Sequence, residues 1–192
     1  MSMRRALFSS KGKLPHTELS YLRSSGTQWI NTGIMGSGDI SVETSLIIRN
    51  NGSGLFGSRI SATNKNYSLC VHRSDYNNEN RTFTTLPLNT KHLIYKNKGN
   101  TYINGVLVTS VPYASFNNLL SIYLFTQNYN NSPNGAFQIY LHLIFETKIW
   151  NDTTLVRDFV PVLRNDGVYC MYDKVSKTYF TNSGTDVFSG GM

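Results

Sequence analysis

The spacing of the carboxyl groups shows whether this sequence could catalyse glycoside hydrolysis. Glycoside hydrolysis needs two carboxyl groups about 5–10 Å apart, a spacing that two residues on one strand face can reach when they are two positions apart. No acidic pair in the chain is that close in sequence, and Glu146 is the only acidic residue on its predicted strand face. We therefore predict no catalytic residues and no enzyme activity, and a pair assembled from different strands stays open as the alternative. The nearest pairs are Asp39 with Glu43, Asp75 with Glu79, and Asp152 with Asp158.

The histidines and cysteines do not have the spacing of a metal site. The sequence contains no H-x-H, H-E-x-x-H or C-x-x-C pattern. No motif places a nucleophilic Ser or Cys beside a base and an oxyanion-binding turn. Cys70 and Cys170 each lie in a strand-like stretch, which favours two reduced core thiols over a disulfide. The prediction is no metal and no cofactor.

Sugar binding needs a flat aromatic ring for the C–H face of the sugar and amide or carboxylate groups for its hydroxyls. The stretches 72–81 and 126–135 both place one Tyr among several Asn residues. The same composition is typical of plain turns, because the backbones of Asn and Gly tolerate positive φ. The candidate carbohydrate-binding residues in these stretches are Tyr76, Asn77, Asn78, Asn128, Tyr129 and Asn130.

A third candidate is the polar face of the stretch QIYLHLIFETKIW, residues 138–150. Its strict alternation predicts a long strand whose odd-numbered positions face a core. The even-numbered positions are mixed polar and aromatic, which suits either a binding face or contact with a neighbouring subunit. We take Tyr140, His142 and Trp150 as candidate sugar contacts, beside Glu146 and Lys148.

The elements that must position these residues are strands. Tyr, Phe, Val, Ile and Thr are frequent, only 15% of the residues are charged, and no Glu/Lys/Ala-rich helical stretch occurs. Strand-like runs recur every 8–12 residues, which predicts an all-β antiparallel sandwich or barrel. Asn104-Gly105 predicts a two-residue hairpin. The expected strands are 18–22, 28–31, 40–49, 54–60, 67–72, 81–84, 92–96, 101–104, 106–110, 119–126, 137–150, 156–163, 167–172 and 178–180.

Charge is concentrated at the N-terminus. The net charge is +7, but four basic residues precede the first acidic one, and those that follow are scattered along the strands. Nucleic-acid binding is therefore not expected, because binders cluster their basic residues. We predict a basic arm over residues 1–17 and one domain over 18–192. No run of about 20 apolar residues is present, so no membrane insertion is predicted. The basic residues of the arm are Arg4, Arg5, Lys11 and Lys13.

Three segments carry a resemblance to a known family. KHLIYKNKGNTYINGVLV (91–108) resembles the central hairpin of the laminin G-like branch of concanavalin A-like jelly rolls. YLRSSGTQWINTGI (21–34) and the segment from LVRDFVP to FSGG (155–191) resemble the opening and closing of a variant common in phage and prophage structural proteins. The resemblance implies a jelly-roll β-sandwich with adjacent first and last strands. It also implies that Trp29 packs where these two ends meet, rather than acting as a sugar platform.

Function follows from the resemblance as an expectation. It implies a phage virion structural protein, such as a head or tail fibre, that is assembled in the bacterial host cytoplasm and attaches to host or mucosal glycans. The alternatives are a capsid or tail decoration protein with protein contacts only, and a glycoside hydrolase. The basic arm would anchor the domain to other virion proteins, and exposed sheet edges predict a homodimer or homotrimer.

The resemblance also raises the question of calcium binding. Laminin G-like domains often hold calcium with Asp and Asn oxygens at the rim of the sandwich. Asp39, Asp75, Asn77 and Asn78 have suitable oxygens, but the D-x-D-x-D-G loop is absent. Calcium is therefore an open alternative and not a prediction.

Overall fold

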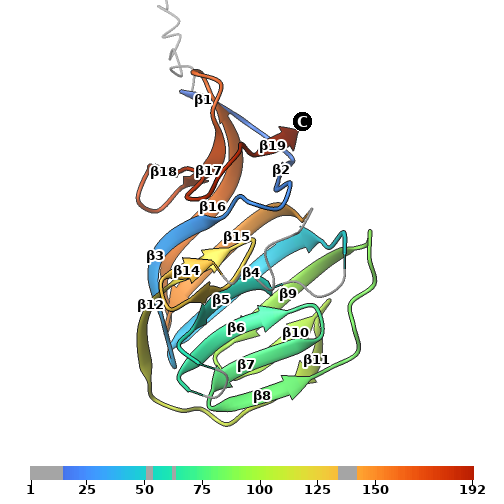
Figure 1. Ribbon diagram of the computed structural model, residues 1–192, viewed down its shortest axis with the longest axis vertical. Coiled ribbons are helices and arrows are strands. Elements are labelled where there is room, and N and C mark those ends of the chain that lie inside the picture. Colours follow the sequence, from blue (N-terminus) through green and yellow to red (C-terminus); the bar gives the residue numbers. More distant parts are fainter. Residues whose placement is uncertain (1–14, 51–53, 62–63, 134–141) are drawn as a thin grey trace, which may run out of the picture.

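The computed structural model describes residues 15–50, 54–61, 64–133 and 142–192 (Figure 1). These residues form two sheets packed face to face, and no helix occurs among them. All strand pairs are antiparallel except a two-residue pairing of β13 with β5. The predicted all-β antiparallel sandwich is confirmed. No helix in the described part of the chain is long and apolar enough to span a membrane.

The first sheet, sheet A, has the strand order β11-β10-β9-β4-β15-β16-β17-β18, with β1 beside β16 and β2 between β15 and β19. Its strands are β1 (His16–Glu18), β2 (Tyr21–Arg23), β4 (Ile40–Ile47), β9 (Lys91–Asn97), β10 (Asn100–Ile103), β11 (Val106–Thr109), β15 (Leu143–Asn151), β16 (Thr154–Arg164), β17 (Tyr169–Asp173), β18 (Thr178–Phe180) and β19 (Ser189–Gly191).

The second sheet, sheet B, has the order β14-β13-β5-β6-β7-β8, and β12 pairs with both β5 and β3. Its strands are β3 (Ile30–Ser37), β5 (Gly54–Arg59), β6 (Asn66–Cys70), β7 (Arg73–Asn77), β8 (Glu79–Thr82), β12 (Asn117–Leu124), β13 (Asn128–Tyr129) and β14 (Ser132–Pro133). Figure 1 shows β16, β17, β18, β1 and β19 extending beyond the part of sheet A that sheet B covers.

The core lies between the sheets and follows the alternation of the strands. On β9 the side chains of His92, Ile94 and Lys96 are buried, while Leu93 and Tyr95 face outward. The inward positions of β4 and β15, and those of β5 and β6 in the facing sheet, supply further core residues, all almost fully buried: Val42, Leu46, Ile149, Phe56 and Leu69. The presence of a lysine in this interior was not predicted.

The predicted hairpin at Asn104-Gly105 is confirmed. Ile103 pairs with Val106, and the two turn residues have φ of 51° and 81°. These are the positive angles that a type I′ turn requires. The hairpin joins β10 to β11 at the edge of sheet A.

Within the described part of residues 138–150, the predicted alternation holds from Glu146 to Trp150. Thr147 and Ile149 are buried and Trp150 faces outward, as expected. A β-bulge between Ile144 and Glu146, opposite β4, changes the phase of the strand before that point. The change of phase buries His142, so its predicted position on the outer face is wrong.

The first and last parts of the chain meet around Trp29. Its backbone N–H donates to the Asn182 side chain at 3.1 Å, and its carbonyl accepts from Ser183 N–H at 2.9 Å. The indole stacks on the Tyr123 ring with centroids 4.1 Å apart. A Cβ on Gly184 would lie 1.9 Å from the Thr27 carbonyl oxygen, so this contact requires glycine. Trp29 lies at the predicted seam.

Candidate functional site

A hollow of about 420 Å³ lies on the outer face of sheet A, where β9 and β15 end and β4 begins. It combines aromatic rings with amide, hydroxyl and charged groups. Its lining residues are Ser41, Tyr95, Asn97, Lys98, Trp150, Asp152 and Thr153.

Strand register brings the lining residues together. β4 lies between β9 and β15, and Ser41 is paired with Asn97 on one side and with Trp150 on the other. Directly paired residues of an antiparallel sheet project from the same face, so these three side chains form one row across the sheet. Tyr95 lies two residues before Asn97 on the same face.

The aromatic part of the hollow consists of two rings that meet nearly at a right angle, which we call the aromatic corner. Trp150 meets Tyr95 edge to face, with centroids 6.3 Å apart and planes at 80°. Tyr102, the cross-strand partner of Tyr95, extends the aromatic surface at a centroid distance of 6.0 Å. Trp150 and Tyr95 are half-buried, so each ring is held by packing while part of it stays open to solvent.

The polar part is oriented by hydrogen bonds. Ser41 Oγ donates to Asn97 Oδ1 at 2.9 Å, which turns the amide nitrogen of Asn97 away from Ser41. Lys98 Nζ lies 3.0 Å from Asp152 Oδ1, and this hydrogen bond raises the pKa of the Lys98 ammonium above its usual value. The rim of the hollow therefore presents an amide, an ammonium and a carboxylate close together.

Tight turns hold the rim. Lys98 and Asp152 have φ of 54° and 53°, and Asp152 N–H donates to the Asp39 carbonyl at 2.9 Å. A Cβ on Gly99 would lie 2.1 Å from the Val111 carbonyl oxygen, so the turn after Lys98 needs glycine to fit beneath that segment. Tyr113 lies in the chain beyond it, where its ring lies 5.3 Å from Lys98 Nζ and its hydroxyl donates to Asp39 Oδ1 at 3.0 Å.

The structure does not bring the first predicted loop to this hollow. Residues 73–82 form the hairpin β7–β8 instead of an open loop. Tyr76 is 0% exposed, and its hydroxyl donates to the Gly38 carbonyl at 2.8 Å. The prediction of Tyr76 as a sugar contact is therefore wrong, because its strand alternates inward at that position. Asn77 and Asn78 form the turn of the hairpin, and Asn78 Oδ1 accepts from Lys65 N–H at 3.3 Å.

The second predicted loop is also a hairpin, β13–β14. Asn128 is 0% exposed and its amide donates to the Ser121 carbonyl at 2.8 Å, so its assignment as a sugar contact is wrong as well. Tyr129 is 40% exposed. Asn130 and Asn131 form the turn, with φ of 50° and 64°. This hairpin offers one exposed aromatic ring away from the hollow.

The third predicted group consists of Tyr140, His142 and Trp150, and the structure supports only one of them as a surface residue. Trp150 lines the hollow, whereas His142 is 1% exposed, and burial lowers the pKa of its imidazole to about 4. A side chain buried to this degree cannot contact a glycan, so this part of the prediction is wrong. Tyr140 and the basic residues Arg4, Arg5, Lys11 and Lys13 lie outside the described residues.

Asp75, one of the residues considered for calcium, is used within sheet B. Asp75 is fully buried and is held by Arg73 Nε at 2.9 Å and by the Ser68 hydroxyl at 2.8 Å. Arg59 Nε lies 3.7 Å from the same carboxylate. Among the described residues, no group of three His, Cys, Asp or Glu side chains could hold a metal ion. The Asp75 carboxylate therefore belongs to an ion-pair network in sheet B, together with Arg73 and Arg59.

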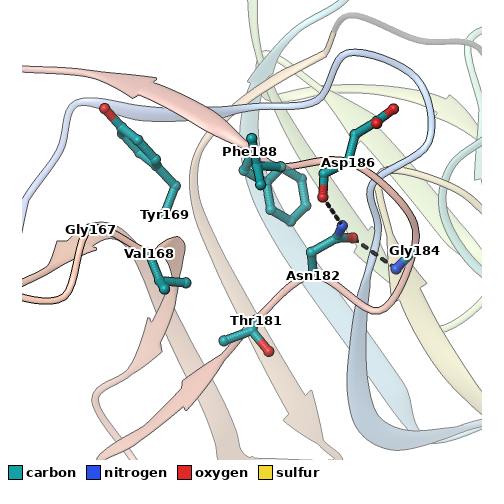
Figure 2. A pocket seen from close by; sticks show the side chains of 9 residues that line it. Gly167, Val168, Tyr169, Thr181, Asn182, Gly184, Asp186 and Phe188 are labelled. Atoms are coloured by element: carbon teal, nitrogen blue, oxygen red, sulfur yellow. Dashed lines mark hydrogen bonds between the residues drawn. The ribbon is translucent and has the colours of Figure 1, made fainter.

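A second hollow, of about 400 Å³, lies beside the C-terminal segment (Figure 2). Its polar groups are used within the fold. Asn182 Oδ1 accepts from Gly184 N–H at 2.8 Å, and its amide donates to the Asp186 carbonyl at 2.9 Å. Phe188, which closes the inner side, is almost fully buried. These contacts hold the loop that fixes Trp29, so we assign this hollow to the fold.

Sequence reasoning missed every lining residue of the first hollow except Trp150. The alternation of residues 91–97 could have placed Tyr95 and Asn97 on one face of a strand. It could not have placed that face beside Trp150, because β4 separates the two strands and lies far from both in the sequence.

No protein-family model, curated protein or solved structure gives a significant match to this chain.

Proposed function

We propose that this protein is a lectin-like β-sandwich that binds carbohydrate in the hollow around Trp150. The observation that supports this most is the aromatic corner of Trp150 and Tyr95 beside the oriented amide of Asn97. The apolar C–H face of a pyranose packs on an aromatic ring, and its hydroxyls need donors and acceptors within reach. Asn97, Lys98 and Asp152 supply both kinds of group.

Binding without hydrolysis is the proposed activity. A glycosidase needs one carboxyl group that is protonated when it acts. An Asp152 oxygen already accepts a hydrogen bond from the Lys98 ammonium at 3.0 Å. Asp39 Oδ1 accepts a hydrogen bond from the Tyr113 hydroxyl at 3.0 Å. Both carboxyl groups of the rim are therefore engaged by neighbouring side chains, which suits a surface that holds hydroxyl groups.

The biological setting that we propose is the surface of a phage particle. The resemblance of residues 21–34 and 155–191 to phage structural proteins supports a head or tail appendage. The basic residues before residue 14 would then anchor the domain to other virion proteins. A decoration protein that makes only protein contacts is the competing function.

A glycan array followed by titration calorimetry on each positive glycan tests the binding proposal. We expect Trp150→Ala to weaken binding at least tenfold. The matched control is Tyr129→Ala, which removes an exposed ring from the other sheet. Loss of binding in the control with retention in Trp150→Ala would move the site to β13. Wild-type protein that binds no glycan would overturn the proposal in favour of the decoration protein.

Tryptophan fluorescence gives an independent measurement, because the chain has only two Trp residues. In a Trp29→Phe variant the remaining emission comes from Trp150, and a sugar in the hollow should change it. New reducing ends in the same samples would contradict the absence of hydrolysis.

A further inference from the structure

The free edges of the two sheets differ in how they are protected. An edge strand exposes unpaired N–H and C=O groups, and proteins block such edges with charges, prolines, short strands or covering groups. β8 carries the exposed ion pair of Arg81 with Glu79, at 2.9 Å. β14 is two residues long and ends in Pro133. On β3, the Thr32 carbonyl accepts from Arg157 Nε at 3.1 Å. The far edge of sheet A, β18, is three residues long.

The strand β11 is four residues long, one more than β18, and its pairing with β10 contains a β-bulge, but it lacks the charges and prolines of the other edges. It contains no charge and no proline, and no Asp, Glu, Lys or Arg occurs anywhere between Lys98 and Glu146. Val106 is 64% exposed and Leu107 is 50% exposed, so the edge is apolar as well as unpaired. In a two-residue hairpin the residues that flank the turn bond each other, so the amide of Leu107 points away from β10.

An apolar groove continues this surface. A hollow of about 400 Å³ runs beside β11 and is lined mainly by apolar side chains. They include Phe83, Leu86 and Pro87 from the segment between β8 and β9, together with Ile103 and Val108. Side-chain contacts could therefore add to the backbone hydrogen bonds that the edge offers.

We propose that β11 is the dimerisation edge of this protein and that its partner is a second copy of the chain. The two β11 strands would pair antiparallel about a two-fold axis perpendicular to the sheet, which joins sheet A of both copies into one sheet. An uncharged apolar strand is complementary to itself, because pairing brings no like charges together. A strongly charged partner would find no opposite charge on this edge.

The pairing has a consequence for the hollow around Trp150. Leu107 pairs with Tyr102, so β11 shares its outer face with the aromatic surface of the hollow. A two-fold axis perpendicular to the sheet keeps the outer faces of both copies on the same side. The dimer would then present two hollows to one glycan-coated surface and gain avidity. This consequence rests on the proposed function, whereas the dimer itself does not.

Sedimentation equilibrium of the full chain tests the proposal without any glycan. We expect a monomer–dimer equilibrium, and we expect Leu107→Lys or Val106→Lys to raise the dissociation constant at least tenfold. The control is Thr82→Lys, which places a lysine on the edge strand β8 and should leave the equilibrium unaltered. A wild-type monomer at the highest attainable concentration, or an oligomer that survives both lysine variants, would overturn the proposal.

Hydrogen exchange on the wild-type protein keeps the test independent of the variants' folding. The Leu107 amide should become more protected as protein concentration rises, while the amides of β8 do not change. Equal protection at low and high concentration would also overturn the proposal. If the dimer forms but no glycan binds, the interface stands and the proposed function fails.

Discussion

Lys96 and Lys98 are two residues apart, yet they occupy opposite kinds of environment. Lys96 is 0% exposed between the two sheets, and its ammonium lies 2.7 Å from Ser74 Oγ and 5.1 Å from the centre of the Tyr67 ring. Burial lowers its pKa to about 7. Lys98 lies at the rim of the hollow, where the hydrogen bond to Asp152 raises its pKa.

The two lysines mark the boundary between a closed interior network and an accessible outer face. The interior polar groups bond one another: Ser74 Oγ also lies 2.8 Å from Thr101 Oγ1, and the Tyr67 hydroxyl donates to the Lys96 carbonyl at 3.0 Å. A ligand cannot reach such a network through two packed sheets. The outer face holds the same chemical groups at a surface that a ligand can reach. Substitutions inside should therefore change stability, and substitutions outside should change binding.

The largest effect should come from Lys96→Met. It replaces a buried ammonium by an apolar side chain of similar length, which should stabilise the protein near pH 7 by about 1–4 kcal/mol. The pKa of Lys96 is about 7 in the folded protein, against 10.5 for an ordinary lysine side chain, so between these pH values the unfolded chain binds more protons. Wild-type stability should therefore rise with pH across that window.

Denaturant unfolding at several pH values measures this prediction. The Lys96→Met variant should lose the part of the pH dependence that arises from Lys96. Below pH 7 the lysine is protonated in both states, so its contribution no longer varies with pH. A variant less stable than wild type throughout the window would contradict the assignment of a costly buried amine.

A smaller effect is expected from Ser74→Ala. It removes the hydroxyl that lies 2.7 Å from Lys96 Nζ, and a buried donor left without its partner costs about 1–3 kcal/mol. In the Lys96→Met background the same change should cost less, because the amine is gone. A double-mutant cycle from unfolding curves measures the difference. Equal costs in both backgrounds would show that Ser74 acts through Thr101 instead.

The smallest effect should come from Lys98→Met, the same substitution at the rim. Exposed ion pairs contribute little to stability, so the stability should change little on this substitution, and the change should shrink at high salt. Any glycan affinity should fall more than stability does. A loss of stability larger than the gain from Lys96→Met would reverse the comparison between interior and rim.

Much of the fold could be predicted from the sequence. Alternation correctly assigned Trp150 to an outer face and Ile149 to an inner one, and Asn104-Gly105 located a hairpin. The candidate site was predicted only in part. Tyr76 looked like a loop residue because Asn follows it, but the hairpin β7–β8 continues its alternation into the core. His142 was assigned to the wrong face because a bulge cannot be read from alternation alone.

The sequence by itself determined the class of fold and the faces of its regular strands, because a period of two is a local property of the backbone. Tertiary structure decided which strands are neighbours and which face is covered. Only the insertion of β4 between β9 and β15 brings Asn97, Ser41 and Trp150 into one row. Only the cover of sheet B makes Lys96 an interior residue while Lys98, two positions on, stays in water.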